Sequence, residues 1–258
     1  MPESRQELLE FAVEVAWRAG RITLGHFHAG VRAEAKPDLT PVTIADREAE
    51  LRCRELIASK YPTDGIVGEE YGVERPDARR RWILDPIDGT KSFVRGVPLY
   101  GVLVAVEEAG QAVVGVAHFP ALNETVWAAR GLGCWWDGRR ALVSAVDSLD
   151  AAVVLSSDFE SFGGHGHGPA WERLRARSWF NRTWGDCYGY ALVATGRAEA
   201  MLDPIVSLWD AAAIQPIIEE AGGVFTDWHG ARSHTGTSII ATNAALSREV
   251  REVLASGG

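Results

Sequence analysis

The sequence predicts an α/β fold in which two halves, residues 1–147 and 148–258, form one compact unit. A chain of 258 residues is near the upper size for one hydrophobic core, which favours two closely packed halves over independent modules. The first half begins with helical apolar spacing and continues with strand-like segments, whereas the second half alternates strand-like and helix-like segments. The apolar fraction of 47% and the charged fraction of 24% are typical of a globular protein.

The first half is predicted to begin with two helices, over residues 3–26 and 43–60. In the first, apolar residues recur at intervals of three and four. The segment between them contains KPDLTPVT, whose two prolines and aspartate predict a loop. A short strand at 66–67, a charged loop and a buried strand over RWILD follow, because bulky apolar residues run consecutively there. Clustered or alternating β-formers then predict strands at 102–106, 113–119 and 125–128.

The second half is predicted to start with a strand at 153–156 and a helix at 169–177. Asp186 is expected to cap the next helix, which should stop at Gly196. SLWDAAAIQPIIEEAGG predicts another helix, with Asp210 in its first turn, a kink at Pro216 and a glycine pair at its end. Strands at 224–226 and 238–242 and a terminal helix from Ser247 complete the chain.

Composition excludes several classes of function. No run of about 18 uncharged apolar residues could span a bilayer, and the N-terminus lacks the apolar core of a signal peptide, so we expect a cytoplasmic protein. Three cysteines far apart, without a CxxC pair, argue against a disulfide framework and a zinc knuckle. The net charge of −9 disfavours nucleic acid as a partner. If such an acidic chain binds a phosphorylated molecule, metal ions must supply much of the positive charge.

The run WILDPIDGT carries the main chemical signal. A strand is predicted to end at Asp85, the next residue is a proline that forbids ladder pairing, and Asp88 follows, so both carboxylates can turn toward one point. Mg²⁺ prefers oxygen ligands, so such a corner suits it. Gly89 permits close backbone approach, and its amide and that of Thr90 could face a phosphate if a helical turn starts there. For an isolated DxxDG, a turn whose carboxylates merely cap backbone amides remains the alternative.

Further motifs join this run in a family order. They are KPDLTPVTIAD, GEE, WILDPIDGTKSF, the GD pair at 185–186, LVATGRAEA and WDAAAIQPIIEEAGG. Together they resemble the inositol monophosphatase family of metal-dependent, lithium-sensitive phosphatases over nearly the whole chain. The resemblance implies a layered αβαβα sandwich of the sugar-phosphatase type, two or three Mg²⁺ ions per active site, a small phosphate monoester as substrate, and a homodimer. Membranes and nucleic acids are not expected as partners.

The resemblance also implies roles for individual residues. The first metal would be held by Glu69, Asp85 and the carbonyl of Ile87. The second would be shared by Asp85, Asp88 and Asp210, and a weaker third ion would use Glu69 and water near Asp46.

The attacking water and the substrate are assigned in the same way. Thr90, held by Asp46, would orient the water together with Glu69. The predicted substrate contacts around the phosphate are Asp88, Gly89, Thr90 and Asp210. In the loop after the first helix, Lys36 resembles a family residue near the metals, with a solvated surface lysine as the alternative.

The alcohol part of the substrate is expected to meet the second half of the chain. Where typical inositol monophosphatases have a small neutral sequence, this chain has WGDCYGY, which introduces Asp186, and Asp203 stands where they have a glutamate. Carboxylates favour a cationic substrate through charge-assisted hydrogen bonds. The surrounding pattern resembles the histidinol-phosphate phosphatases of the family. This resemblance implies that Asp186 and Asp203 bind the α-amino or imidazole group of the substrate, and that Arg182 belongs to the substrate-binding residues and supports the loop. Alternatives are inositol 1-phosphate, several sugar phosphates, or a non-catalytic binding relative.

His165 and His167 lie two residues apart in a glycine-rich loop. A zinc site would need further ligands that the neighbourhood does not offer. A lid that touches the substrate is the more plausible role for this loop.

Overall fold

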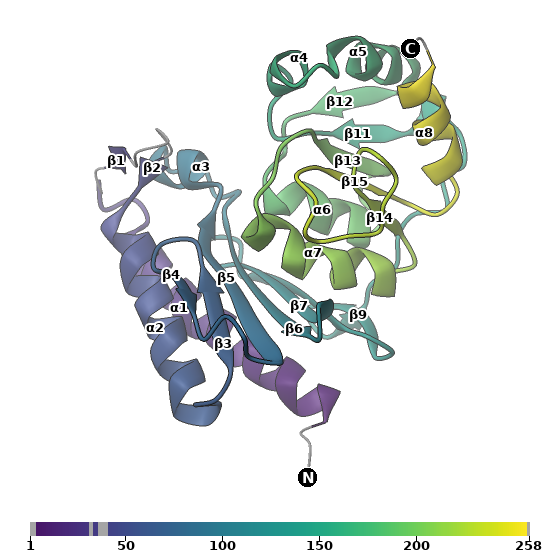
Figure 1. The fold of residues 1–258 in the computed structure, drawn as a ribbon. Helices are drawn as coiled ribbons and strands as arrows, with labels where there is room; N and C mark the ends of the chain where they lie inside the picture. Colours follow the sequence, from purple (N-terminus) through teal and green to yellow (C-terminus); the bar gives the residue numbers. More distant parts are fainter. Residues whose placement is uncertain (1–3, 31–32, 36–40, 257–258) are drawn as a thin grey trace.

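Five alternating layers of helices and sheets make up the computed structural model, which describes residues 4–30, 33–35 and 41–256 (Figure 1). Two helices cover one face of an eight-stranded sheet, two lie between this sheet and a five-stranded sheet, and three cover the outer face of the second sheet. The layers, in order, contain α1 (Arg5–His26) and α2 (Ile44–Lys60), then α6 (Cys187–Ala194) and α7 (Leu208–Glu220), then α4 (Ser161–Gly164), α5 (Gly168–Arg177) and α8 (Ser247–Ala255). The predicted αβαβα sandwich is confirmed.

The eight-stranded sheet has the order β10-β9-β8-β7-β6-β5-β3-β4, and within it only β3 and β5 pair in parallel. Its strands are β3 (Gly65–Gly68), β4 (Gly72–Glu74), β5 (Arg80–Asp88), β6 (Gly101–Glu108), β7 (Gln111–Phe119), β8 (Glu124–Ala129), β9 (Gly133–Trp136) and β10 (Arg139–Arg140). The strands predicted at 102–106, 113–119 and 125–128 are confirmed as β6, β7 and β8, which pair antiparallel in succession, and the short helix α3 (Thr90–Val94) lies between β5 and β6.

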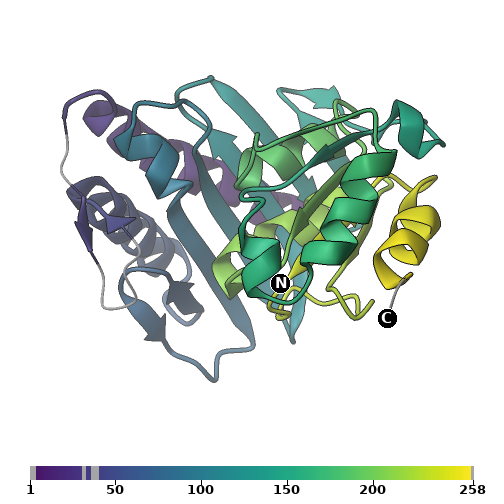
Figure 2. The ribbon, with the colours of Figure 1, turned by 90° about the horizontal axis from the view of Figure 1, so that it is seen from above.

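The five-stranded sheet has the order β12-β11-β13-β15-β14 and contains only strands of the second half. They are β11 (Val153–Leu155), β12 (Phe180–Arg182), β13 (Ala200–Asp203), β14 (Val224–Thr226) and β15 (Ile239–Thr242), preceded by a 3-10 turn, Leu149–Ala151. A separate two-stranded pair, β1 (Glu34–Ala35) and β2 (Pro41–Val42), precedes α2. Seen from above, the two halves of the chain lie side by side (Figure 2).

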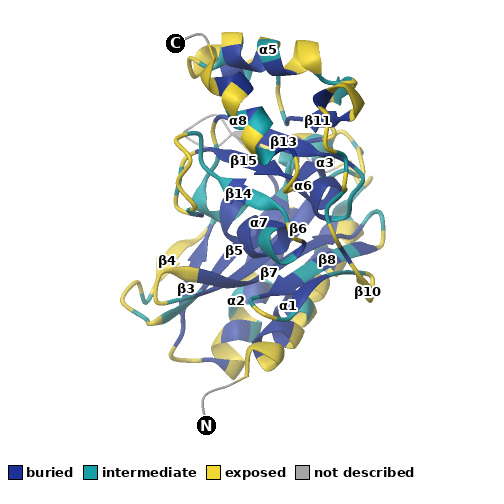
Figure 3. Cartoon of the chain, turned by 90° about the vertical axis from the view of Figure 1, so that its right-hand side faces the viewer, coloured by how far each residue is buried: buried dark blue, intermediate teal, exposed yellow. Residues whose placement is uncertain are grey.

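Alternation along the strands builds three stacked cores. On β5, Trp82 and Leu84 pack with α1 and α2, whereas Ile83 joins the core shared with α6 and α7. On β13, Met201 faces this shared core, and its neighbours on either side face the outer helices. This pattern follows because successive strand residues point to opposite faces. The central strands of both sheets are therefore buried on two sides, and exposed residues lie on the outer helices, the loops and the edge strands β4 and β10 (Figure 3).

One local prediction about the WILDPIDGT run was wrong: β5 does not end at Asp85. Asp85 pairs with Leu103 and Asp88 pairs with Gly101, so the strand resumes after a bulge. The bulge forms because Pro86 has no N–H to donate to the ladder and the chain must loop out. Strands β12 and β13 were not predicted either.

Two findings concern the membrane-spanning and disulfide-linked classes of protein, which the composition argued against. Within the described residues, no helix has both the length and the apolar character needed to cross a membrane. Cys53, Cys134 and Cys187 are free and buried.

Candidate active site

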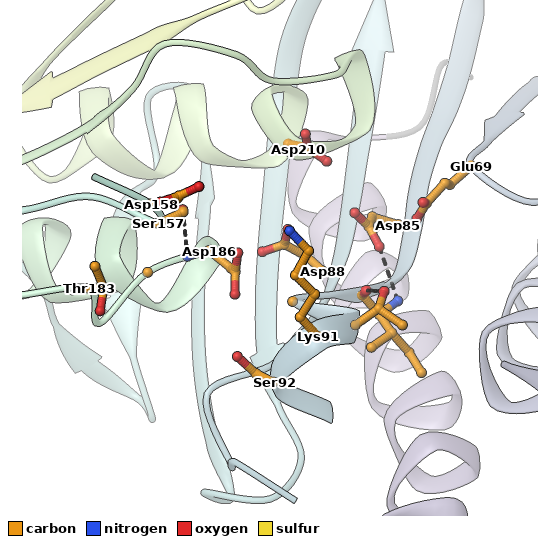
Figure 4. Close-up of a pocket in the computed structure, with 14 residues that line it drawn as sticks. Glu69, Asp85, Asp88, Lys91, Ser92, Ser157, Asp158, Thr183, Asp186 and Asp210 are labelled. Carbon is orange, nitrogen blue, oxygen red and sulfur yellow. Dashed lines mark hydrogen bonds between the residues drawn. The ribbon is translucent and has the colours of Figure 1, made fainter. Parts of the chain in front are cut away.

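A cavity of about 410 Å³ opens between the two halves of the chain, at the bulge of β5 (Figure 4). Glu69 and Asp85 lie on one side of it, Ser157 and Asp186 lie on the opposite side, and Asp210 enters from α7. The lining residues are Glu69, Asp85, Ile87, Asp88, Gly89, Thr90, Lys91, Ser92, Ser157, Asp158, Thr183, Gly185, Asp186 and Asp210. Acidic side chains therefore dominate the polar surface of the cavity.

The bulge and the turn after it are held by hydrogen bonds within the DPIDGT run. The N–H of Ile87 donates to Oδ1 of Asp85 at 3.0 Å, and the hydroxyl of Thr90 donates to the carbonyl of Ile87 at 3.0 Å. Gly89 has a φ of 86°, and a Cβ there would lie 2.9 Å from Oδ2 of Asp186. Only glycine combines this backbone conformation with room for the opposing carboxylate.

Asp85, Asp88 and Asp210 form a compact carboxylate cluster. Each offers one oxygen, and these oxygens all lie within 4.8 Å of one another. Burial raises the pKa of Asp85, and the charges of Glu69 and Asp88 raise it further. Burial also raises the pKa of Asp210 to about 6. So many partly buried carboxylates at one point repel one another, and a divalent cation relieves this repulsion.

Glu69 and Asp46 complete the acidic side of the site. The N–H of Glu69 donates to the carbonyl of Leu84 at 3.3 Å, which sets Glu69 beside the residue that precedes Asp85 on β5. Asp46 is fully buried, and one of its oxygens accepts from the N–H and the hydroxyl of Thr43, at 2.7 and 2.6 Å. Burial raises the pKa of Asp46 to about 6, and the charge of Glu69 adds to this effect.

The predicted contact in which Asp46 holds Thr90 is not found among the described residues. The hydroxyl hydrogen of Thr90 goes to Ile87, and no hydrogen bond joins Thr90 to Asp46 among the described residues. The second oxygen of Asp46, Oδ1, is buried without a hydrogen-bond partner. Lys36 lies outside the described residues.

Asp186 precedes α6, but its predicted role as a side-chain cap was wrong. Its side chain makes no capping hydrogen bond, and its φ of 51° and ψ of −155° turn the carboxylate into the cavity. Oδ2 of Asp88 instead accepts from the N–H of Cys187, the first residue of α6. Burial raises the pKa of Asp186 to about 6, and Lys91 and Ser92 partly oppose this shift.

Asp203 lies beneath the loop that carries Ser157. Oδ1 of Asp203 accepts from the N–H of Ser157 at 2.9 Å, and Oδ2 accepts from the hydroxyls of Ser157 at 3.0 Å and Tyr190 at 2.6 Å. The hydroxyl of Ser157 in turn accepts from the N–H of Asp186 at 2.8 Å. Asp203 is thus connected to Asp186 through Ser157. Burial raises the pKa of Asp203 to about 7, although its hydrogen bonds oppose the shift.

The side of the cavity that the second half of the chain forms is called here the second wall. The sequence did not predict several of its residues, notably Ser157, Asp158 and Thr183. Ser157 follows β11 and Thr183 follows β12, and these two strands are parallel neighbours. The carboxyl ends of parallel strands meet at one edge, where ligands commonly bind. Recognition of β12 as a strand would therefore have indicated both residues.

Two other predicted regions lie away from the cavity lining. The guanidinium of Arg182 lies 5.1 Å from the ring centre of Phe180, and its Nη1 donates to the carbonyl of Asn181. His167 stacks on Trp228 with ring centres 4.0 Å apart, and Nδ1 of His165 contacts the carbonyl of Ser161. Neither histidine lines the cavity.

Comparisons with known proteins agree with this geometry. A family model described as the inositol monophosphatase family matches residues 4–256. A histidinol-phosphatase of Chlorobaculum parvum is 43% identical over 251 residues, which cover 96% of this chain and 97% of the relative. A histidinol-phosphatase of Mycobacterium tuberculosis is 41% identical over 255 residues, which cover 96% and 98%. The solved structure of a Thermotoga maritima IMPase superposes with a TM-score of 0.88 at 32% identity, over 96% of each chain.

Proposed function

The chain belongs to the inositol monophosphatase family, and we propose that it hydrolyses L-histidinol phosphate to L-histidinol and inorganic phosphate with Mg²⁺, as a step of histidine biosynthesis. One observation carries the choice of substrate: the carboxylate of Asp186 lies beside Asp88, on the opposite side of the cavity from Asp85. A phosphate at the cluster would leave the alcohol part facing Asp186. A carboxylate there suits an ammonium group and contributes little to a neutral polyol.

The residues of the cluster fit Mg²⁺. The donors are carboxylates and one carbonyl, without thiol or imidazole, which is the ligand set that Mg²⁺ prefers. We propose that Glu69, Asp85 and the carbonyl of Ile87 hold one ion, and that Asp85, Asp88 and Asp210 hold a second. The carbonyl of Ile87 accepts one hydrogen bond, from Thr90, and has a second lone pair available. When bound, Mg²⁺ neutralises phosphoryl oxygens and acidifies water.

The protein's own groups then position the reactants. Thr90 and Glu69 line the acidic side of the cavity and are proposed to orient the attacking water. Asp46, whose Oδ1 is buried without a partner, lies close enough to raise the pKa of Asp85 and is proposed to support this side of the site. In-line attack at phosphorus would send the leaving alcohol toward Asp186.

The predicted contacts of Asp203 and Arg182 with substrate receive less support. Four donors already engage the oxygens of Asp203, so we propose that it acts on the substrate through Ser157 and Asp186. Arg182 stacks on Phe180 on the strand that precedes Thr183, so we propose that it supports the loop.

The edge strand β12 supports the proposed homodimer. It lies at the edge of the five-stranded sheet, and exposed aromatic residues flank it: Trp179 is 67% exposed and Trp184 is 41% exposed. An unpaired sheet edge beside exposed aromatic rings suits a protein interface. Light scattering measures the oligomeric state directly.

Two other functions are the competing proposals. The likeness to the Thermotoga maritima IMPase favours inositol 1-phosphate or several sugar phosphates as substrates. A non-catalytic relative would be expected to lack part of the cluster, whereas Glu69, Asp85, Asp88, Thr90 and Asp210 all line this cavity.

Phosphate release from L-histidinol phosphate and from myo-inositol 1-phosphate tests the proposal. With Mg²⁺, we expect a higher kcat/KM for L-histidinol phosphate, and EDTA should abolish release from both.

Asp186→Asn should lower kcat/KM for L-histidinol phosphate about tenfold or more, because it removes a charge-assisted hydrogen bond. Asp158→Asn, which removes a charge from an exposed residue of the same wall, is the matched control and should have a smaller effect. Preference for inositol 1-phosphate by the wild type would reject the substrate and leave the reaction class intact.

A further inference from the structure

Glu50 is a buried carboxylate on α2 that none of the predicted roles includes. Its exposed fraction is 0%, and it does not line the cavity. Oε2 accepts from the N–H of Glu70 at 2.7 Å, and Oε1 accepts from the N–H of Tyr71 at 3.2 Å. Nε of Arg54, one helical turn later, donates to Oε1 at 2.8 Å. A charge buried this deeply is tolerated only when it is paired and hydrogen-bonded, and both conditions hold here.

The two amides that Glu50 binds belong to the turn that carries Glu69. The N–H of Glu69 donates to Leu84 on β5, and the next two amides donate to Glu50 on α2. The backbone of Glu69 is thus held between a strand and a helix. Its carboxylate points to that of Asp85, the residue after Leu84 (Figure 4).

Close packing around the carboxylate of Glu50 leaves this side chain little freedom. A Cβ at Gly68 would lie 2.0 Å from Oε1 of Glu50, so the strand that leads to Glu69 packs directly on the carboxylate. On the far side of the turn, Nη2 of Arg54 donates to the carbonyl of Gly72 at 2.6 Å. Glu50 and Arg54 therefore hold the turn from Gly68 to Gly72 at both ends.

We propose that Glu50 is a positioning residue for the metal site: it fixes the turn that presents Glu69 and thereby sets the affinity for Mg²⁺ without touching the ion or the substrate. Groups that orient metal ligands commonly change affinity by 10- to 100-fold when they are removed, about the range expected here. The inference rests on the proposed function in one respect, which is that Glu69 is a metal ligand.

Direct Mg²⁺ titration of substrate-free protein tests this role. In Glu50→Gln, the side-chain NH₂ group must face either Arg54 or a backbone N–H, and both are donors. The turn should loosen, and Mg²⁺ should bind about tenfold more weakly by calorimetry. The half-saturating Mg²⁺ concentration for phosphate release should rise by the same factor, whereas kcat at saturating Mg²⁺ should change less than twofold, because the reacting groups are intact.

Asp64→Asn is the matched control for loss of a buried charge. Asp64 is 5% exposed and precedes β3 at the end opposite Glu69, and its Oδ2 accepts from Nε of Arg80 at 2.6 Å and from Nε1 of Trp82 at 2.9 Å. This variant should lower Tm and leave the Mg²⁺ affinity unchanged. Equal loss of affinity in Glu50→Gln and Asp64→Asn, or unchanged affinity in both, would overturn the proposal.

Gly68→Ala approaches the same contact from the strand and keeps the test decisive if Glu50→Gln does not fold. The added methyl group displaces the carboxylate of Glu50, so we expect weaker Mg²⁺ binding here too. Wild-type affinity in Gly68→Ala would contradict the proposed role. If the wild type itself binds no Mg²⁺, the proposed function fails; if the wild type binds and the variants bind equally well, only the role of Glu50 fails.

Discussion

The two walls of the cavity hold their carboxylates by different means. On the wall from the first half, Asp85 and Asp88 lie on β5, and ladder pairing with β6 on both sides of the bulge fixes their backbone. On the wall from the second half, Asp186 lies in a loop, with a φ of 51°, and side-chain hydrogen bonds through Ser157 and Asp203 hold it. Side-chain contacts change with single substitutions, whereas a central sheet does not. A substitution on the second wall can therefore change the contacts of Asp186 and leave the backbone of Asp85 and Asp88 in place.

Asp88 connects the two walls. Its backbone belongs to the first wall, and its Oδ2 accepts from the N–H of Cys187, which follows Asp186 directly. Burial raises the pKa of Asp88, and the charge of Asp186 is the next cause. The two walls are therefore coupled at this side chain.

The largest effect is expected at Asp88 itself. Asp88→Asn keeps an oxygen that can accept from Cys187 and removes one charge from the proposed metal ligands, so turnover should fall by orders of magnitude while the protein stays folded. Steady-state phosphate release and circular dichroism measure the two properties. Full activity of a folded Asp88→Asn protein would show that the first wall does not set the reaction.

A smaller and more selective effect is expected at Ser157. Ser157→Ala removes the acceptor for the N–H of Asp186, whose φ of 51° is unfavourable without it. KM for L-histidinol phosphate should rise about tenfold, equivalent to one lost hydrogen bond, and kcat should change little. Ser157→Thr keeps the hydroxyl and should restore most of the wild-type KM. An equal rise in KM for myo-inositol 1-phosphate would mean that Ser157 does not act through Asp186.

The same contrast decides how much the sequence could predict. The cluster of Asp85, Asp88 and Asp210 was predictable because Asp85 and Asp88 lie in one short motif and Asp210 lies in the first turn of a helix. The bulge at Pro86 was not, because a missing N–H can end a strand or interrupt it, and only the pairing with Gly101 decides between these outcomes.

The second wall was less predictable because its contacts join distant segments. Ser157 meets Asp203 and Asp186, 46 and 29 residues away in sequence. Asp186 occupies the predicted capping position, but a carboxylate 98 residues earlier, on Asp88, supplies the cap. Local propensity favours the nearest acceptor, and tertiary packing overrode it here.

The smallest effect should appear in stability, at Asp203. Burial raises its pKa to about 7 in the folded protein, above the ordinary value of 3.8, so the folded state favours the protonated form. The stability that this group contributes is fully present below about pH 4 and is lost as the pH rises to about 7, because the unfolded chain ionises first. Between pH 5 and pH 6 this loss amounts to about 1 kcal/mol.

Asp203→Asn is nearly isosteric and cannot ionise, so its free energy of unfolding in EDTA should fall less over that interval than the wild type's. Denaturant titrations at both pH values measure the difference, with Asp150→Asn, at an exposed position, as the control. Identical pH dependence in wild type and Asp203→Asn would mean that Asp203 is ionised throughout and holds Ser157 as a carboxylate.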